Sequence, residues 1–215
     1  MAELALASQS SLLSYIVGSV TAPRATVRQL MAEPQLKSVV WRLVLVSAAV
    51  SAAATILAGL YEYLYRSFEP VLLPSDYPVA DIFLWGVIEL GLFIGSFLLI
   101  RFLWAYLFGY RNETIAIWAA AAMSCCLLMI LDPLLEIAWL VQGDPDTAST
   151  FMVFGAYLLV FLLIVAIYFS AALVISYLKA VALALCALLV DLFAVTVILF
   201  GMIGIPILFS MQATQ

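Results

Sequence analysis

The chain of 215 residues contains no histidine, and only 10% of its residues are charged. Without histidine, the sequence cannot form a Ser-His-Asp triad, a histidine-ligated metal site or an imidazole pH switch. Soluble domains carry about 25% charged residues, so these charges are too few for a water-facing surface. The eight basic residues are outnumbered by 13 acidic ones, which argues against a nucleic-acid-binding or polybasic lipid-binding surface.

Cysteine is also scarce, and the motifs that mark common enzyme classes do not occur. The three cysteines, Cys125, Cys126 and Cys186, lie inside apolar runs, so we interpret them as small apolar helix residues and not as a disulfide framework. We find no P-loop, dinucleotide-binding glycine pattern, His-Glu metal motif or nucleophile elbow. The sequence therefore predicts a protein that is not an enzyme and that binds no cofactor.

Apolar residues are abundant instead: they make up 67% of the chain, and the mean hydropathy is +1.23. Soluble proteins do not tolerate so much exposed apolar surface. A bilayer core needs about 20 mostly apolar residues per helix. Five stretches meet that need, which predicts an all-α, polytopic integral membrane protein, a five-span transmembrane helix bundle. They are Trp41–Tyr61, Val79–Leu103, Thr114–Val141, Phe151–Leu173 and Ala180–Ser210.

The basic residues indicate an orientation, because Lys and Arg near the ends of spans prefer the cytoplasmic side. Seven of the eight lie in the N-terminal segment or in the connections that follow the second and fourth spans: Arg24, Arg28, Lys37, Arg42, Arg101, Arg111 and Lys179. The other side holds Arg66 among acidic residues that include Glu69, Asp76, Glu136, Asp144 and Asp146. We predict a cytoplasmic N-terminus and an external C-terminus.

Residues 1–38 form an amphipathic segment before the transmembrane domain of residues 39–215. Thr21-Ala22-Pro23 is typical of a helix start. Val27, Leu30 and Met31 then share one face, with Arg24 and Arg28 along its flank. We expect one or two short helices that lie in the cytoplasmic interface; the alternative is a lead-in helix packed under the bundle.

Two carboxyl groups fall deep inside predicted spans, where an ionised side chain is costly. Glu89 lies eight residues after Asp81, and Asp191 lies twelve residues after Lys179. At 1.5 Å per residue these positions are about 12 Å below the outer end and about 18 Å above the inner end. In a core about 30 Å thick the two depths coincide, so Glu89 and Asp191 could face each other. They would then hold or share protons or bind a cation; the alternative is that each is a hydrogen-bonded carboxyl that holds helices together.

Other residues have structural interpretations. Asp132-Pro133 is explained by the end of a helix near the outer side, although a kinked helix could continue beyond it. Gly201, Gly204 and Pro206 predict a break in the last span. Small residues of the first and third spans indicate close helix packing: Ser47, Ala48, Ala49, Ser51, Ala52, Ala53, Ala54, Gly59 and Ala119–Ala122. Two aromatic groups are typical of interfacial belts: Tyr61, Tyr63, Tyr65 and Trp104, Tyr106, Tyr110.

The segment Val20–Met31, with its proline followed after a few residues by leucine, resembles the lead-in of the Yip-one family of Ypt/Rab-interacting membrane proteins. Trp41–Ala49 is similar to the opening of that family's first span, and Arg111-Asn112-Glu113-Thr114 to the polar step before its third span. Asp132-Pro133-Leu134-Leu135 is similar to the Pro-Leu-Leu end of that span. The resemblance extends from about Ser14 onward and is to the bacterial branch.

This resemblance implies a five-helix membrane bundle in the bacterial inner membrane and no catalytic residues. Eukaryotic members act as adaptors that contact small GTPases through a longer N-terminal region than the one here. Our first hypothesis is therefore a non-enzymatic scaffold or adaptor, with Pro23, Arg24, Arg28 and Leu30 as the contact region. Its expected partners are the lipid bilayer and other membrane proteins, a second copy of the chain among them, and not nucleic acid. The alternative is a small proton- or cation-coupled transporter or channel component that uses Glu89 and Asp191.

Overall fold

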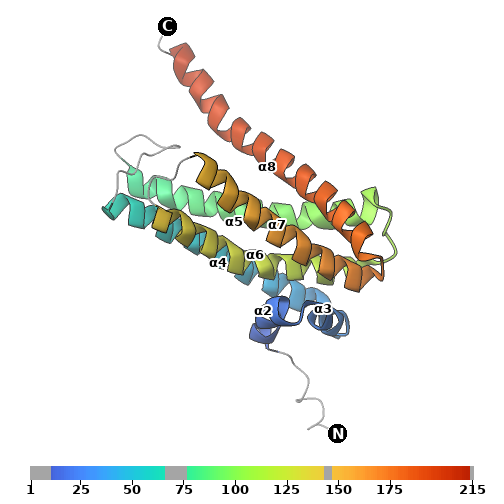
Figure 1. The fold of residues 1–215 in the computed structure, drawn as a ribbon. Helices are drawn as coiled ribbons and strands as arrows, with labels where there is room; N and C mark the ends of the chain where they lie inside the picture. The colour runs from blue at the N-terminus through green and yellow to red at the C-terminus, as the bar shows by residue number, and fades with distance from the viewer. Residues whose placement is uncertain (1–10, 66–76, 143–146, 214–215) are drawn as a thin grey trace.

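Five long apolar helices dominate the computed structural model, which describes residues 11–65, 77–142 and 147–213 (Figure 1). Each predicted span falls on one of these helices. Their bounds are α4 Leu36–Tyr65, α5 Pro78–Phe102, α6 Thr114–Gln142, α7 Thr147–Leu173 and α8 Tyr177–Ala213. After Phe102 the chain continues as one π-helical stretch, η1, Leu103–Leu107. Gly109 then reverses the chain with a φ of +80°, which a residue without a Cβ adopts readily.

Helix α6 lies at the centre of the bundle. In its most apolar window 72% of the residues are buried, against 11–33% in the other four long helices. Its neighbours are α4, α5 and α7. The predicted small-residue packing is confirmed for Ala119–Ala122 on α6 and for Ser47, Ala48, Ser51 and Ala52 on α4, which are buried, whereas Ala49 and Ala53 are exposed. Short side chains let the two backbones approach closely.

The outer helices expose apolar side chains to their surroundings. Phe193 and Phe200 on α8 are more than 70% exposed, as is Met152 on α7, and Phe151 beside it is 68% exposed. Such a surface is stable against lipid and not against water. The chain is therefore an all-α membrane protein with five helices long and apolar enough to span a bilayer.

Two short helices, α2 Leu12–Thr21 and α3 Pro23–Met31, precede the bundle. The Ser11 hydroxyl caps α2 by accepting a hydrogen bond from the Ser14 backbone N–H at 3.2 Å, and Pro23 opens α3 as expected. The apolar faces of both helices pack against the bundle: α2 contacts α6, and α3 contacts α6 and α7. The Tyr168 hydroxyl of α7 donates a 2.8 Å hydrogen bond to the carbonyl of Ser19. Val27 and Leu30 are fully buried, so both helices pack under the bundle; their position in the cytoplasmic interface stays a prediction.

Two expected helix interruptions do not occur. Helix α6 continues through Asp132 and Pro133 to Gln142, so the helix-ending interpretation of this pair is wrong. Within a membrane protein a proline is tolerated inside a helix because neighbouring helices stabilise it. The backbone of α8 is likewise helical from residue 177 to 213, through the expected break at Gly201, Gly204 and Pro206, and its C-terminal half extends away from the bundle (Figure 1). The acidic loop residues Glu69, Asp76, Asp144 and Asp146, together with Arg66, lie outside the described residues.

Candidate functional site

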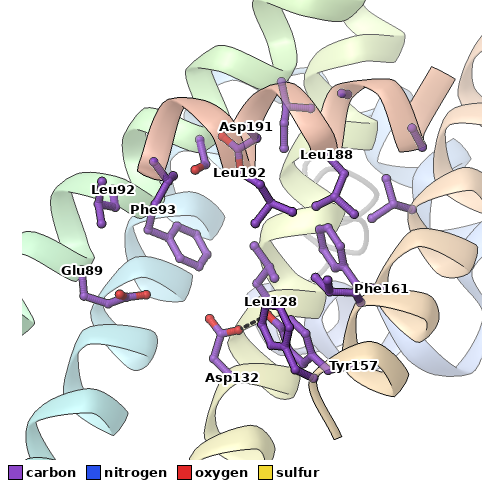
Figure 2. A pocket seen from close by; sticks show the side chains of 18 of the residues that line it. Glu89, Leu92, Phe93, Leu128, Asp132, Tyr157, Phe161, Leu188, Asp191 and Leu192 are labelled. Carbon is purple, nitrogen blue, oxygen red and sulfur yellow. Dashed lines mark hydrogen bonds between the residues drawn. The ribbon is translucent and has the colours of Figure 1, made fainter. Parts of the chain in front are cut away.

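A cavity of about 250 Å³ lies between α5, α6, α7 and α8 (Figure 2). Most of its wall is apolar, and no lysine or arginine is among the described residues that form it. The polar members of the wall are Glu89 and Ser96 from α5, Asp132 from α6, Tyr157 from α7 and Asp191 from α8, with the indole of Trp104 from η1. Three carboxyl groups from three helices therefore face one apolar cavity.

The spacing of the polar residues along α5 and α6 determines where they lie in the cavity. Glu89 and Ser96 are seven residues apart, which is about two turns, so they lie on the same face of α5 about 10 Å from each other. Asp132 lies one turn before Glu136 on α6. The Glu136 side chain lies close enough to Glu89, Asp132 and Glu62 of α4 for their charges to interact. A line of carboxyl groups thus runs from the cavity toward the end of the bundle that the sequence assigns to the outer side.

A hydrogen-bonded network joins two of the acids. The Ser51 hydroxyl of α4 lies 2.7 Å from Asp132 Oδ2 and 3.3 Å from Glu89 Oε1. The Tyr157 hydroxyl donates to Asp132 Oδ1 at 2.5 Å. Figure 2 shows the Tyr157–Asp132 bond and the Glu89 carboxyl pointing toward Asp132. One network therefore ties four helices together at the level of the two acids.

The number of hydrogens in this network decides which of its contacts can be full hydrogen bonds at the same time. The Ser51 hydroxyl carries one hydrogen and can donate it to one carboxyl at a time. Ser51 therefore makes its shorter contact to Asp132 and its longer one to Glu89. A proton on Glu89 would let both contacts be full hydrogen bonds, with Glu89 donating to Ser51 and Ser51 donating to Asp132.

Asp191 occupies a separate position in the same cavity. Its carboxyl lies within hydrogen-bonding reach of Ser96, two turns along α5 from Glu89, and its Oδ1 atom is buried with no hydrogen-bond partner. Glu89 and Asp191 thus line one cavity, but Asp191 lies at the level of Ser96 and not of Glu89, and the carboxyl next to Glu89 is Asp132. The sequence interpretation missed Asp132 because it treated this residue as part of a helix end.

Trp104 lines the same cavity from η1. The expectation that it belongs to an interfacial belt is wrong: its side chain is fully buried and stacks on Phe169 of α7 with ring centroids 3.8 Å apart and planes 6° apart. Its indole Nε1–H is buried without a hydrogen-bond partner. Among the other predicted belt residues, Tyr61, Tyr63, Tyr65 and Tyr106 are exposed, whereas Tyr110 is half-buried and its hydroxyl is buried. The cavity wall therefore holds one unpaired donor, on Trp104, and one unpaired acceptor, on Asp191.

The remaining predicted site residues lie elsewhere. Pro23, Arg24, Arg28 and Leu30 belong to α3 and are not part of the cavity wall. Arg24 and Arg28 are exposed, whereas Leu30 is buried. The cysteines are unpaired, and Cys125 and Cys126 are buried in α6. Within the described ranges, no group of three or more Cys, Asp or Glu side chains is arranged to hold a metal ion.

Comparison with family models, with curated proteins and with solved structures gives no significant match for this chain. The class of the protein therefore follows from its own fold: an all-α membrane protein with five helices that could span the bilayer. Its most distinctive site is the carboxyl-lined cavity.

Proposed function

We propose that the protein binds protons or monovalent cations in the carboxyl-lined cavity and moves them, as a small coupled transporter or channel component. The observation that supports this proposal is the convergence of Glu89, Asp132 and Asp191 on one cavity whose described wall contains no lysine or arginine. A structural role needs fewer acids, because one hydrogen-bonded carboxyl is enough to hold two helices together.

The energetics of burial favour a bound positive charge. An ionised carboxylate at the centre of a membrane helix costs about 2.5–3.5 kcal/mol on insertion scales. Three carboxyl groups around one cavity lower that cost when they take up protons or share a cation. Asp191 Oδ1, buried and unpartnered, is an acceptor for such a ligand.

The two ends of the cavity differ in a way that suits a carrier better than an open pore. Glu62 and Glu136 extend the acidic groups toward the predicted outer side. At the opposite end the wall includes Trp104, whose ring stacks on Phe169 of α7, and we infer that this pair limits passage. A cation that enters from the acidic end would meet the Glu89–Asp132 pair first and Asp191 deeper in the cavity.

Proton and cation flux into proteoliposomes tests this function. We expect flux with the wild-type chain and a fall to the level of empty vesicles for Glu89→Gln, Asp132→Asn and Asp191→Asn. Glu113→Gln is the matched control, because Glu113 is an exposed carboxyl outside the cavity wall. Wild-type protein that is folded and reconstituted but moves no ion, or three variants that all retain flux, would contradict the proposal.

A non-enzymatic scaffold or adaptor of the Yip-one type is the second candidate. One observation favours it: α3 buries Val27 and Leu30 against the bundle and leaves Arg24 and Arg28 exposed, so a basic surface is held in place for a membrane partner or for anionic lipid. Replacement of both arginines with glutamine should then weaken association with membrane partners or acidic vesicles. Unchanged association would remove this candidate.

We further propose that the chain lies in a bacterial inner membrane with its N-terminus in the cytoplasm. The positions of Arg42, Arg101, Arg111 and Lys179, at the α4 start, the α5 end, the η1–α6 connection and the α8 start, support this orientation. Asn112→Cys tests it, because residue 112 is exposed in that connection. A membrane-impermeant maleimide should label it only after the membrane is opened; labelling of intact cells would reverse the orientation.

A further inference from the structure

A second cavity, of about 150 Å³, lies at the opposite end of the bundle from the acidic groups, between the end of α5, η1 and the beginning of α6. Its polar wall is formed by Arg101, Tyr106, Arg111, Thr114 and Trp118. No aspartate or glutamate is among the described residues of this wall. The local charge is therefore strongly positive, in a chain whose overall charge is −5.

Aromatic rings hold both guanidinium groups. Arg101 Cζ lies 4.7 Å from the centroid of a Trp118 ring, and Arg111 Cζ lies 4.9 Å from that of Tyr106. A guanidinium has five N–H donors in a rigid fork, which suits carboxylate and phosphate oxygens. Among the described residues neither arginine forms an ion pair, so two fixed cations face the cavity with donors available for an anion.

The surroundings add to the attraction for an anion. Thr114 is the first residue of α6, so the positive end of a 29-residue helix dipole lies at the cavity. Glu113, the acidic residue next to it in the sequence, is exposed and outside the wall. Arg101 lies 23 residues after Pro78, about 35 Å along the helix, which is the length needed to reach the membrane surface.

We propose that Arg101 and Arg111 bind a phosphate group at this membrane surface. The phosphate is carried either by an anionic phospholipid headgroup or by a small soluble molecule. The shared chemistry is a tetrahedral anion that accepts hydrogen bonds from two guanidinium groups and from the beginning of α6. This site is independent of the carboxyl-lined cavity, and neither proposal requires the other.

Native mass spectrometry of the purified full-length chain tests the site and distinguishes its two sources. The lipid arm uses dioctanoyl phosphatidylglycerol, with dioctanoyl phosphatidylcholine as the headgroup without net charge; the soluble arm uses inorganic phosphate and glycerol 3-phosphate. We expect Arg101→Gln and Arg111→Gln each to weaken binding roughly tenfold. Arg42→Gln is the matched control because Arg42 is an exposed arginine of α4 outside this cavity.

The conservative variant Arg101→Lys guards against misfolding, because it keeps the positive charge but loses the planar fork. We expect it to bind more weakly than wild type and more tightly than Arg101→Gln. Saturable binding in the lipid arm assigns a headgroup, and binding in the soluble arm assigns a free phosphate compound. Binding that survives both arginine-to-glutamine changes, or that falls equally with Arg42→Gln, would overturn the proposal, as would a folded wild-type chain that binds neither probe.

Discussion

The hydrogen bond from Tyr157 to Asp132 offers a quantitative test of the carboxyl network, because it joins α7 to α6 at 2.5 Å inside the membrane-spanning region. Tyr157→Phe removes one donor and leaves the ring in place. Hydrogen bonds to charged groups contribute about 1.5–3 kcal/mol in soluble proteins, and those between membrane helices average about 0.6 with a maximum near 1.7 kcal/mol. Since Asp132 accepts from both Tyr157 and Ser51, we expect a value at the upper end, about 1–1.5 kcal/mol.

A double-mutant cycle isolates that contribution. Free energies of unfolding are measured by SDS titration in mixed micelles, followed by circular dichroism, for wild type, Tyr157→Phe, Asp132→Ala and the double variant. We expect Tyr157→Phe to be nearly neutral once Asp132 is absent, so the coupling energy should approach about 1 kcal/mol. Tyr63→Phe, an exposed tyrosine of α4, should show no coupling. A Tyr157–Asp132 coupling below about 0.3 kcal/mol, the usual limit of additivity, would refute the network as described.

Three further predictions concern packing and the backbone. A Cβ on Gly86 would lie 2.4 Å from Ile56 Cγ1, so Gly86→Ala should lower the free energy of unfolding by about 1–3 kcal/mol. Gly91→Ala in the same helix meets nothing within 4 Å and should be neutral or stabilising in the same SDS titration. Val174 has a φ of +54° in the α7–α8 turn, so Val174→Gly should raise the free energy of unfolding by about 0.5–1 kcal/mol and with it the thermal midpoint. A lower thermal midpoint would contradict the assigned conformation. Pro133→Ala should leave the helical circular dichroism signal unchanged, because α6 is already helical on both sides of it; a large loss of helix would show that the proline is structurally required.

Much of the fold could be predicted because lipid imposes a simple rule on the chain. Every backbone polar group must be paired within the bilayer core, so long apolar runs become helices. The ends were less predictable. The second span was expected to end at Leu103, but η1 extends it to Leu107, since nothing in its composition marks a π-helical turn.

The depths of the three acids along their helices show which two lie together. In the span that α5 and η1 form together, Glu89 lies 18 residues before Leu107, at the predicted inner end, and Asp132 lies 18 residues after Thr114, at the same end of the bundle. Both carboxyl groups are then about 27 Å from the predicted inner side. Ser51 contacts both of them at this level. Asp191 is only 14 residues from Tyr177, about 21 Å, and accordingly lies deeper in the cavity. The two depths therefore differ by about 6 Å, because the sequence calculation took Leu103 as the end of the second span and the structure extends it to Leu107.

If the cavity handles protons, as we propose, the network around Ser51 gives the proton a path that simple helix adhesion would not need. With the proton on Glu89, Glu89 donates to Ser51, and Ser51 and Tyr157 donate to Asp132. The Ser51 hydrogen can pass to Asp132 while the Glu89 proton passes to Ser51, and the net result is that one proton has moved from Glu89 to Asp132. Asp132 then donates to Ser51, and Ser51 donates to Glu89. Both arrangements satisfy the same contacts between heavy atoms, so no side chain has to move. Adhesion alone would need only Ser51 and one acid. Ser51→Ala therefore separates the two roles, since it interrupts the transfer and leaves all three carboxyl groups of the cavity in place.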